Sequence, residues 1–490
     1  MNKMRMFFLL VAVLLIARLS SSQDIGGRID SLVADTTLSN AHIGLAVYDI
    51  TADSLIYSHN ADRLFSPASN MKLFTSAAAL GLLGPGYRFK TGFFRTGKID
   101  KKGRLKGDLV IAGGGDPLIS GRFRDSVTEV LELWADSLKS MGIKEIKGDI
   151  VTDNSFFSGP ELGSGWSWAY LSYWFACPIS ALSFNDNCVD LKFLPGENVG
   201  DPAIIEIDPP TDYITITNNA VTLPADSEFT LDYYRKPYTN DVTFFGGISL
   251  SDTAGEIDYV SVHRPELYTA YILAGIIKDK GIKFKGDIVS LDDMEDDQKT
   301  EYRLEKLSPL FEWQSDSLGL VISVINKNSQ NFFAEQSLKT IGRELGGEGS
   351  FSRGIELAEA FFDSIGISSD DIAMRDGSGL SYMNIVKPAA VIKLLEGMCQ
   401  SPYFRTYYES LAIPGEDRSV RTRLKEVENR EHVRAKTGYI ANTSSFSGYV
   451  DGPHAGHLLA FSIIVNNYSC KTSYVTAWHD SVVSLLLLEY

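Results

Sequence analysis

The stretch FSPASNMKLFTSAAALGLLGP, residues 65–85, decides how this sequence is interpreted. Its apolar run from Met71 to Leu83 ends at Gly84-Pro85, a usual stop signal for a helix. Ser69 and Lys72 stand at the start of that run, three residues apart, and therefore share one face of the first helical turn. The free amides at a helix N-terminus also favour a developing anion. The stretch predicts a nucleophilic serine beside a lysine, although a helix cap and a solvated charge explain the pair alone equally well.

A lysine can accept the serine proton only in its neutral form. The pKa of free lysine lies near 10.4, so the side chain needs burial or a second cation nearby before it acts as a base. Lys436 is the candidate for that cation, and it begins the motif Lys436-Thr437-Gly438 ahead of Tyr439. Glycine at a strand edge lets a substrate backbone approach, while Lys436 and Thr437 can hold a carboxylate.

A third motif, Ser329-Gln330-Asn331, lies between these two in the chain. Its hydroxyl and amide groups suit a proton relay and a clamp on a peptide. Each motif alone is explained by a surface loop. The three in this order are much harder to explain by chance.

The regions around the first and last motifs have strand and helix patterns. Residues 43–49 and 55–58 flank a Thr-Ala-Asp-Ser turn and predict a hairpin. Residues 445–450 and 457–465 are two apolar strands joined by Asp451-Gly452-Pro453, and residues 473–488 predict a helix that packs on the core.

The middle of the chain has a different organisation. Lys-Gly-Asp followed by an apolar pair occurs at residues 106–110, 147–151 and 285–289, and the last two copies follow a helical pattern and a Gly-Ile-Lys turn. This repeat predicts small α+β domains inserted between the first and second motifs. Glycines 113–115 have no following Lys-Ser/Thr and no helix start, so turns explain them better than a phosphate-binding loop does.

Length and composition limit the possible classes. With 490 residues, 44% apolar and 22% charged, the chain predicts about three globular domains and excludes collagen-like, coiled-coil and wholly disordered proteins. Its net charge of −16 argues against nucleic-acid binding, which needs clustered Lys and Arg.

The N-terminus predicts export. Lys3 and Arg5 precede an uncharged apolar run, and three serines end at Ser22, so residues 1–22 are interpreted as a cleavable signal peptide, with a membrane anchor as the alternative. No later segment is long enough to span a membrane. The four cysteines form no C-x-x-C pair, and neither a metal nor a cofactor site is predicted. Cys177 and Cys188 are close enough in sequence to bridge, and free buried thiols explain them equally well.

The ordered motifs resemble the signature of penicillin-binding proteins and serine β-lactamases. Ser329 lies 260 residues after Ser69, and Lys436 only 107 residues after Ser329. A large insertion directly after the first motif is similar to the S13 family of D-alanyl-D-alanine carboxypeptidase/endopeptidases, the class C low-molecular-mass penicillin-binding proteins. Residues 178–187 (PISALSFNDN) and 376–381 (DGSGLS) also resemble the family.

The resemblance implies an α+β fold with a penicillin-binding-protein/β-lactamase-like domain, an antiparallel sheet packed with helices, and two smaller insertions. The expected division is a catalytic domain of 23–92 and 305–490, an inserted domain of 93–153 and 260–304, and a β-rich one of 154–259.

The resemblance also implies the chemistry. Ser69 would attack the bond between two terminal D-alanines of peptidoglycan peptides in the periplasm, with Lys72 as base, and β-lactams would acylate the same serine. Ser329 would relay the proton, Asn331 would bind the peptide, and Lys436 with Thr437 would hold the terminal carboxylate. The backbone at Gly438 and Tyr439 would contact the substrate, with the Tyr439 and Ser69 amides forming the oxyanion hole.

Two residues depart from the family pattern: Gln330 stands where Asp is common, and Tyr439 where Thr is frequent. A serine β-lactamase is the first alternative, although no motif for a deacylating base is found. A catalytically weak peptidoglycan-binding protein, whose insertions contact partners, is the second. The preference for free peptide ends or cross-links, and the oligomeric state, stay open.

Overall fold

The computed structural model describes residues 25–452 and 456–490, which form two compact units. The first contains the chain up to Pro85, Ile322–Gln330 and Ala358–Tyr490, and the second contains Gly86–Val321 and Asn331–Leu357. Each unit is therefore built from separate stretches of the sequence. The predicted signal peptide, residues 1–22, lies outside the described residues.

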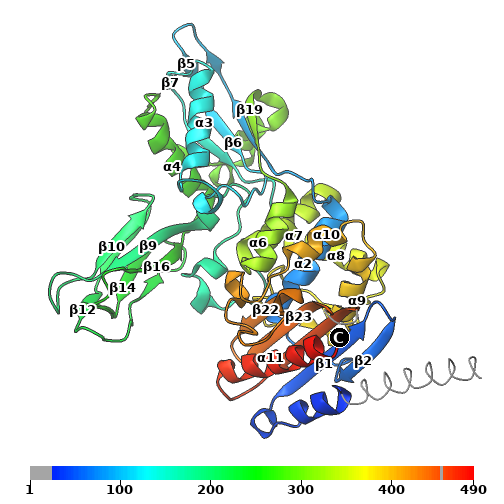
Figure 1. The fold of residues 1–490 in the computed structure, drawn as a ribbon. Coiled ribbons are helices and arrows are strands. Elements are labelled where there is room, and N and C mark those ends of the chain that lie inside the picture. The colour runs from blue at the N-terminus through cyan, green and yellow to red at the C-terminus, as the bar shows by residue number, and fades with distance from the viewer. Residues whose placement is uncertain (1–24, 453–455) are drawn as a thin grey trace, which may run out of the picture. The chain divides into compact units, whose positions relative to one another are not determined.

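The first unit is built on a five-stranded antiparallel sheet in the order β2-β1-β24-β23-β22 (Figure 1). The strands are β1 (His42–Asp49), β2 (Ser54–His59), β22 (Val433–Ile440), β23 (Thr443–Asp451) and β24 (Leu458–Asn466). The pairing of β1 with β24 places Ile43 opposite Val465 and joins the two ends of the chain in one sheet. The hairpin and the C-terminal strand pair predicted from the sequence are confirmed.

Helices cover both faces of this sheet. Phe446 and Ile463 lie on one face in the same apolar cluster as Trp478 of α11 (Thr472–Glu489), which confirms the predicted C-terminal core helix. Side chains alternate along a strand, so Tyr449 lies on the other face. There its hydroxyl donates to the carbonyl of Leu395 in α9 (Pro388–Cys399) at 2.7 Å. The sheet is thus buried on both sides.

In the second unit, the three Lys-Gly-Asp repeats lead into parallel neighbouring strands. These are β6 (Leu109–Ala112), β8 (Ile150–Asp153) and β18 (Ile288–Ser290), in a sheet completed by β3 (Lys90–Arg95) and β19 (Ser308–Gln314). The aspartates form a ladder between the repeats: the Asp149 amide donates to Asp108 Oδ1 at 2.9 Å, and the Asp287 amide donates to Asp149 Oδ1 at 2.8 Å. The predicted repeat is confirmed, and the ladder explains why Asp recurs in it.

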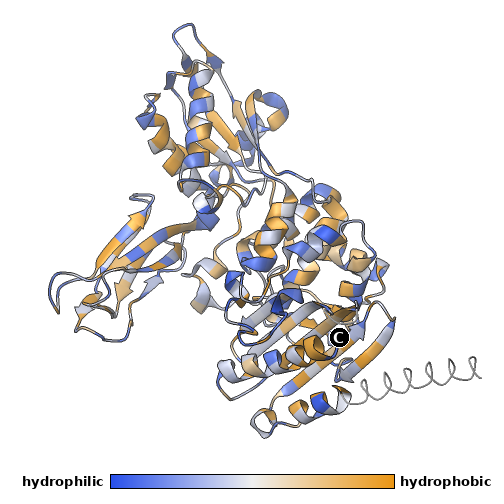
Figure 2. Ribbon diagram, in the orientation of Figure 1, coloured by the Kyte–Doolittle hydropathy of each residue, from blue (hydrophilic) through white to orange (hydrophobic). Residues whose placement is uncertain are grey.

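A hydrophobic cluster runs through most of the second unit. Trp134 of α3 (Glu129–Ser140) is fully buried and packs edge-on against Phe93, and α3 packs against α4 (Pro265–Asp279). Hydrophobic residues run along much of α4 (Figure 2). The β-rich part contributes to the same cluster. Its strands are β9 (Cys188–Leu194), β10 (Ile204–Asp208), β11 (Thr215–Asn218), β12 (Val221–Leu223), β13 (Asp232–Arg235), β14 (Asp241–Phe245), β15 (Gly247–Ser249) and β16 (Glu256–Ser261).

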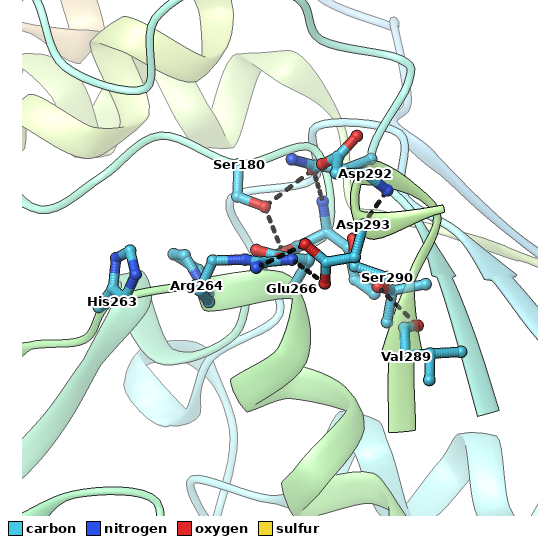
Figure 3. A network of polar contacts seen from close by, with 12 residues as sticks. Ser180, His263, Arg264, Glu266, Val289, Ser290, Asp292 and Asp293 are labelled. Carbon is cyan, nitrogen blue, oxygen red and sulfur yellow. Dashed lines mark hydrogen bonds and ion pairs between the residues drawn. The ribbon is translucent and has the colours of Figure 1, made fainter. Parts of the chain in front are cut away.

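A polar network fixes the start of α4 (Figure 3). Arg264 donates from Nε to Glu266 at 2.7 Å and from its two terminal nitrogens to Asp293 at 2.9 and 3.0 Å. Burial raises the pKa of Glu266, while the Arg264 contacts oppose that rise. The network therefore ties the start of α4 to the turn that follows β18.

Further helices complete the two units. They are α2 (Met71–Leu83), α6 (Leu318–Lys327), α7 (Asn331–Gly346), α8 (Phe351–Ser364) and α10 (Phe404–Ser410). Among the residues the structure describes, no helix has both the length and the apolar character needed to cross a membrane. Cys177 and Cys188 are buried free thiols. The division into a catalytic domain and two inserted domains at the boundaries given above stays a prediction.

Candidate active site

Ser69 lies in a single 3-10 turn, Ala68–Asn70, directly before α2. Strand β23 holds this turn through two side chains. The Ser445 hydroxyl donates to the Pro67 carbonyl at 2.7 Å, and the Asn70 amide donates to Ser447 Oγ at 2.7 Å. The turn is therefore fixed on the sheet at both ends, and Ser69 remains partly exposed between its buried neighbours.

Lys72 lies in the first turn of α2 and is fully buried. Its Nζ is 2.9 Å from Ser69 Oγ and 2.7 Å from the backbone carbonyl oxygen of Ser378. The nitrogen is thus within proton-transfer distance of the serine hydroxyl. A buried lysine between a hydroxyl and a carbonyl has the position that a general base requires.

Ser329 and Lys436 form a second serine–lysine pair in the same unit. Lys436 Nζ donates to Ser329 Oγ at 2.8 Å and to the carbonyl of Thr437 at 2.7 Å. Burial, together with the nearby positive charge of Lys72, lowers the pKa of Lys436 well below its usual range. Ser329 has φ of 57°, in the left-handed region that costs a residue with a side chain about 1–2 kcal/mol. The residue with this strained backbone is the one whose hydroxyl accepts the hydrogen bond from Lys436.

Strand β22 brings the Lys-Thr-Gly motif to the nucleophile from the edge of the sheet. A Cβ at Gly438 would lie 2.9 Å from the backbone nitrogen of Ser69 and 2.8 Å from the Pro67 carbonyl oxygen. Only glycine allows this approach without a shift of the backbone. Tyr439 follows with 61% of its side chain exposed, so it lies open to solvent next to the closest contact.

Asn331 is the first residue of α7 and belongs to the second unit. Its side-chain amide donates to the backbone carbonyl of Phe175 at 2.7 Å, within that unit. The structure thus brings together Ser69, Lys72, Ser329, Lys436 and Gly438 in the first unit. Asn331 follows Ser329 by two residues in the sequence.

The carbonyl of Ser378 is the feature that the motif analysis missed. It comes from the loop Asp376–Ser381 (DGSGLS), in which the sequence predicts that Asp376 and Ser378 shape a loop near the site by turn chemistry or substrate contact, without the contact to Lys72. A backbone carbonyl carries no side-chain signature, so only the unusual density of Gly and Ser could have drawn attention to it. Across residues 25–452 and 456–490, no group of three or more His, Cys, Asp or Glu side chains is placed to hold a metal ion.

A serine at the start of a helix, a buried lysine one turn on, and a Lys-Thr-Gly edge strand define a class: the serine enzymes that include penicillin-binding proteins and β-lactamases. The D-Ala-D-Ala carboxypeptidase 3 (S13) family matches residues 25–486, nearly the whole described chain. The chain therefore belongs to this family of enzymes, as the motif order and the long insertion predicted.

Two named relatives are consistent with this family assignment. The chain is 29% identical over 452 residues to a D-alanyl-D-alanine carboxypeptidase of an Actinomadura species, covering 90% of this chain and 80% of the relative. It is 25% identical over 442 residues to the D-alanyl-D-alanine carboxypeptidase DacB of Haemophilus influenzae, covering 88% and 86%.

Solved structures share this fold. The crystal structure of penicillin binding protein 4 from Haemophilus influenzae superposes with a TM-score of 0.79 at 24% identity, covering 92% of this chain and 97% of that one. A structure of the same protein complexed with a β-lactam gives a TM-score of 0.74 at 22% identity, covering 92% and 97%. The predicted α+β fold with insertions is confirmed.

Proposed function

We propose that this protein is a serine D-Ala-D-Ala peptidase that cleaves peptidoglycan stem peptides through an acyl-enzyme on Ser69. The observation that carries the proposal is the buried Lys72 Nζ, 2.9 Å from Ser69 Oγ. The Lys436–Ser329 pair in the same unit adds the second set of groups that this chemistry needs. Membership of the family supports the substrate class.

In the acylation step, Lys72 takes the Ser69 hydroxyl proton as Oγ attacks the carbonyl carbon of the penultimate D-alanine. The peptide C–N bond then breaks, and the leaving amine of the terminal D-alanine receives a proton through Ser329. The amides of Ser69 and Tyr439 would hold the oxyanion, and loss of one such donor costs about 10²–10³ in rate. The approach of Gly438 to the Ser69 nitrogen supports this pairing of amides.

Lys436 and Thr437 would bind the terminal carboxylate, and Asn331 the peptide backbone. Water then attacks the acyl carbon, which releases the shortened peptide and returns the proton to Ser69. The open edge of β22 beyond Gly438 suits an extended peptide, because an edge strand presents unpaired backbone groups. Export of the protein through the predicted signal peptide, residues 1–22, would bring it to this substrate.

Labelling with a fluorescent penicillin tests the nucleophile. We expect the wild type to be labelled and Ser69→Ala not to be labelled, and mass spectrometry should place the adduct on the peptide that contains Ser69. Equal labelling of the two proteins would contradict the proposal. A long-lived adduct distinguishes a peptidase from a β-lactamase, which would release the opened drug rapidly.

Incubation with defined muropeptides tests the substrate. Monomers that end in D-Ala-D-Ala should lose one alanine, and cross-linked dimers should separate if the protein is also an endopeptidase, with both products identified by mass. Two results together would instead favour a peptidoglycan-binding protein. The wild type would turn over neither substrate, and Lys72→Ala would bind the cell wall as well as the wild type does.

A further inference from the structure

The loop Asp376–Ser381 contacts the nucleophile's helix through its backbone. Besides the Ser378 carbonyl on Lys72, the Gly377 carbonyl accepts the Thr75 hydroxyl at 2.6 Å. Lys72 and Thr75 are one helical turn apart, so two successive carbonyls of the loop hold the same face of α2.

The loop also packs against the turn that carries Ser69. Gly379 has φ of 83°, and a Cβ there would lie 1.8 Å from the carbonyl oxygen of Ala68. Strand β21 (Ile385–Val386), which follows the loop, bridges through Val386 to Phe65 with two backbone hydrogen bonds of 2.8 and 2.9 Å. The loop and the strand that follows it are therefore both held on the segment that precedes the nucleophile.

The Asp376 side chain makes several hydrogen bonds within the loop. Asp376 is fully buried, and its carboxylate accepts the Gly379 amide at 2.8 Å, the Ser381 amide at 2.7 Å and the Asn384 side-chain amide at 2.8 Å. Both carboxylate oxygens are used. The bonds to Gly379 and Ser381 join residues after Ser378 to Asp376 before it, so the position of the Ser378 carbonyl depends on this side chain.

We propose that Asp376 is a positioning residue for the reaction: it folds the loop so that the Ser378 carbonyl holds Lys72 beside Ser69. The inference rests on the proposed function, because it assigns to Asp376 control over the base of that reaction. A lysine acting as base must direct its lone pair at the serine hydroxyl, which leaves its N–H groups to other acceptors. The Ser378 carbonyl is such an acceptor, and it fixes the direction from which Lys72 meets Ser69.

The variant Asp376→Asn tests this role. Asparagine has nearly the same shape, but its NH₂ group must face at least one of the three donors, so the loop loses its closed form. We expect the maximal rate of acylation by a fluorescent penicillin to fall about 10²-fold, the loss expected for a displacement of roughly 1 Å at a reacting group. The concentration of penicillin that gives half-maximal rate should stay near the wild-type value, because Lys436 and Thr437 are unchanged.

Asp49→Asn is the matched control. Asp49 is 3% exposed in the same unit and accepts the Ala52 amide at 2.9 Å in the β1–β2 turn. Both variants should lose stability, measured by thermal unfolding, and both are assayed well below their transitions. Acylation by Asp49→Asn should match the wild type. If Asp376→Asn does not fold, Thr75→Val is the second test, because it removes the hydroxyl bound to the Gly377 carbonyl. It should also lower the maximal rate and leave the half-maximal concentration of penicillin unchanged.

A crystal structure of Asp376→Asn separates this proposal from the proposed function. Acylation at the wild-type rate, or a Ser378 carbonyl still in contact with Lys72, would overturn the positioning role. If the wild type itself were not labelled, the proposed function would fail. The displacement of Ser378 in the variant crystal would then still decide whether Asp376 positions Lys72.

Discussion

Replacement of Gly438 by alanine should disturb the closest contact between β22 and the nucleophile. The new Cβ would lie 2.2 Å from Ser445 Oγ, 2.8 Å from Pro67 O and 2.9 Å from Ser69 N. Ordinary contact begins at 3.4 Å, so the backbone of β22 and that of the serine turn must separate by the difference, about 0.5–0.6 Å. The Ser445 hydroxyl must also rotate and lose its 2.7 Å hydrogen bond to Pro67.

Two effects of Gly438→Ala should be measurable. Overpacking costs about 1–3 kcal/mol, which thermal or urea unfolding would show. A separation of half an ångström should slow acylation about tenfold, since a displacement of roughly 1 Å costs about 10²-fold. If the shift also misaligns one of the proposed oxyanion donors, the loss reaches about 10³-fold. The assay is the acylation rate with fluorescent penicillin, at a temperature where the variant is fully folded.

Gly397→Ala in α9 is the control for the substitution itself. Its Cβ would come no nearer than 3.4 Å to Ile365, so acylation should stay at the wild-type value, while stability should rise by up to about 1 kcal/mol because alanine favours a helix interior over glycine. A folded Gly438→Ala protein that acylates at the wild-type rate would refute the reasoning. It would mean that the contact between β22 and the Ser69 turn has no part in the reaction.

Three further predictions concern single residues. Burial raises the pKa of Asp116 to about 7 from its usual 3.8, so between these pH values the folded state keeps a proton that the unfolded chain has lost. The free energy of unfolding should therefore fall as the pH rises through this range. Urea unfolding of Asp116→Asn at several pH values should lack that part of the fall. Ser329→Gly relieves about 1 kcal/mol of left-handed strain but removes the acceptor of a hydrogen bond from buried Lys436, worth about 1.5–3 kcal/mol, so the melting temperature should fall. Loss of that hydroxyl should slow turnover about 10²–10⁴-fold in a D-alanine release assay. Trp134→Ala should cost about 3–5 kcal/mol in urea unfolding, because the fully buried ring packs on Phe93; a smaller cost would mean that the cluster collapses into the cavity.

Local patterns predicted much of this molecule. The apolar runs in residues 43–49 and 445–465 predicted strands, because strands buried on both faces have continuous apolar sequence between turn signals. The proximity of Ser69 and Lys72 follows from the spacing of three on a helical turn, whatever surrounds it. The Lys-Gly-Asp repeat was readable because each copy makes the same hydrogen bond to the next.

The rest depends on contacts that leave no local pattern. No feature of residues 43–49 specifies β24 as their neighbour, since pairing across more than 400 residues is decided by which faces must be buried together. The left-handed backbone of Ser329 is imposed by its surroundings, because serine alone disfavours it. The assignment of Asn331 to the second unit, two residues after Ser329, likewise reflects packing that the motif itself does not encode.

The two buried lysines explain how an acidic chain can serve an anionic substrate. The protein carries a net charge of −16, which repels a peptide carboxylate at long range. Within the site, Lys436 is fully buried, and both the loss of solvent and the Lys72 charge lower its pKa. A substrate carboxylate bound at Lys436, as proposed above, would reverse the second effect, because an opposite charge stabilises the protonated form. Binding of the substrate carboxylate at Lys436, as proposed, would therefore offset the cost of keeping Lys436 protonated in the buried site.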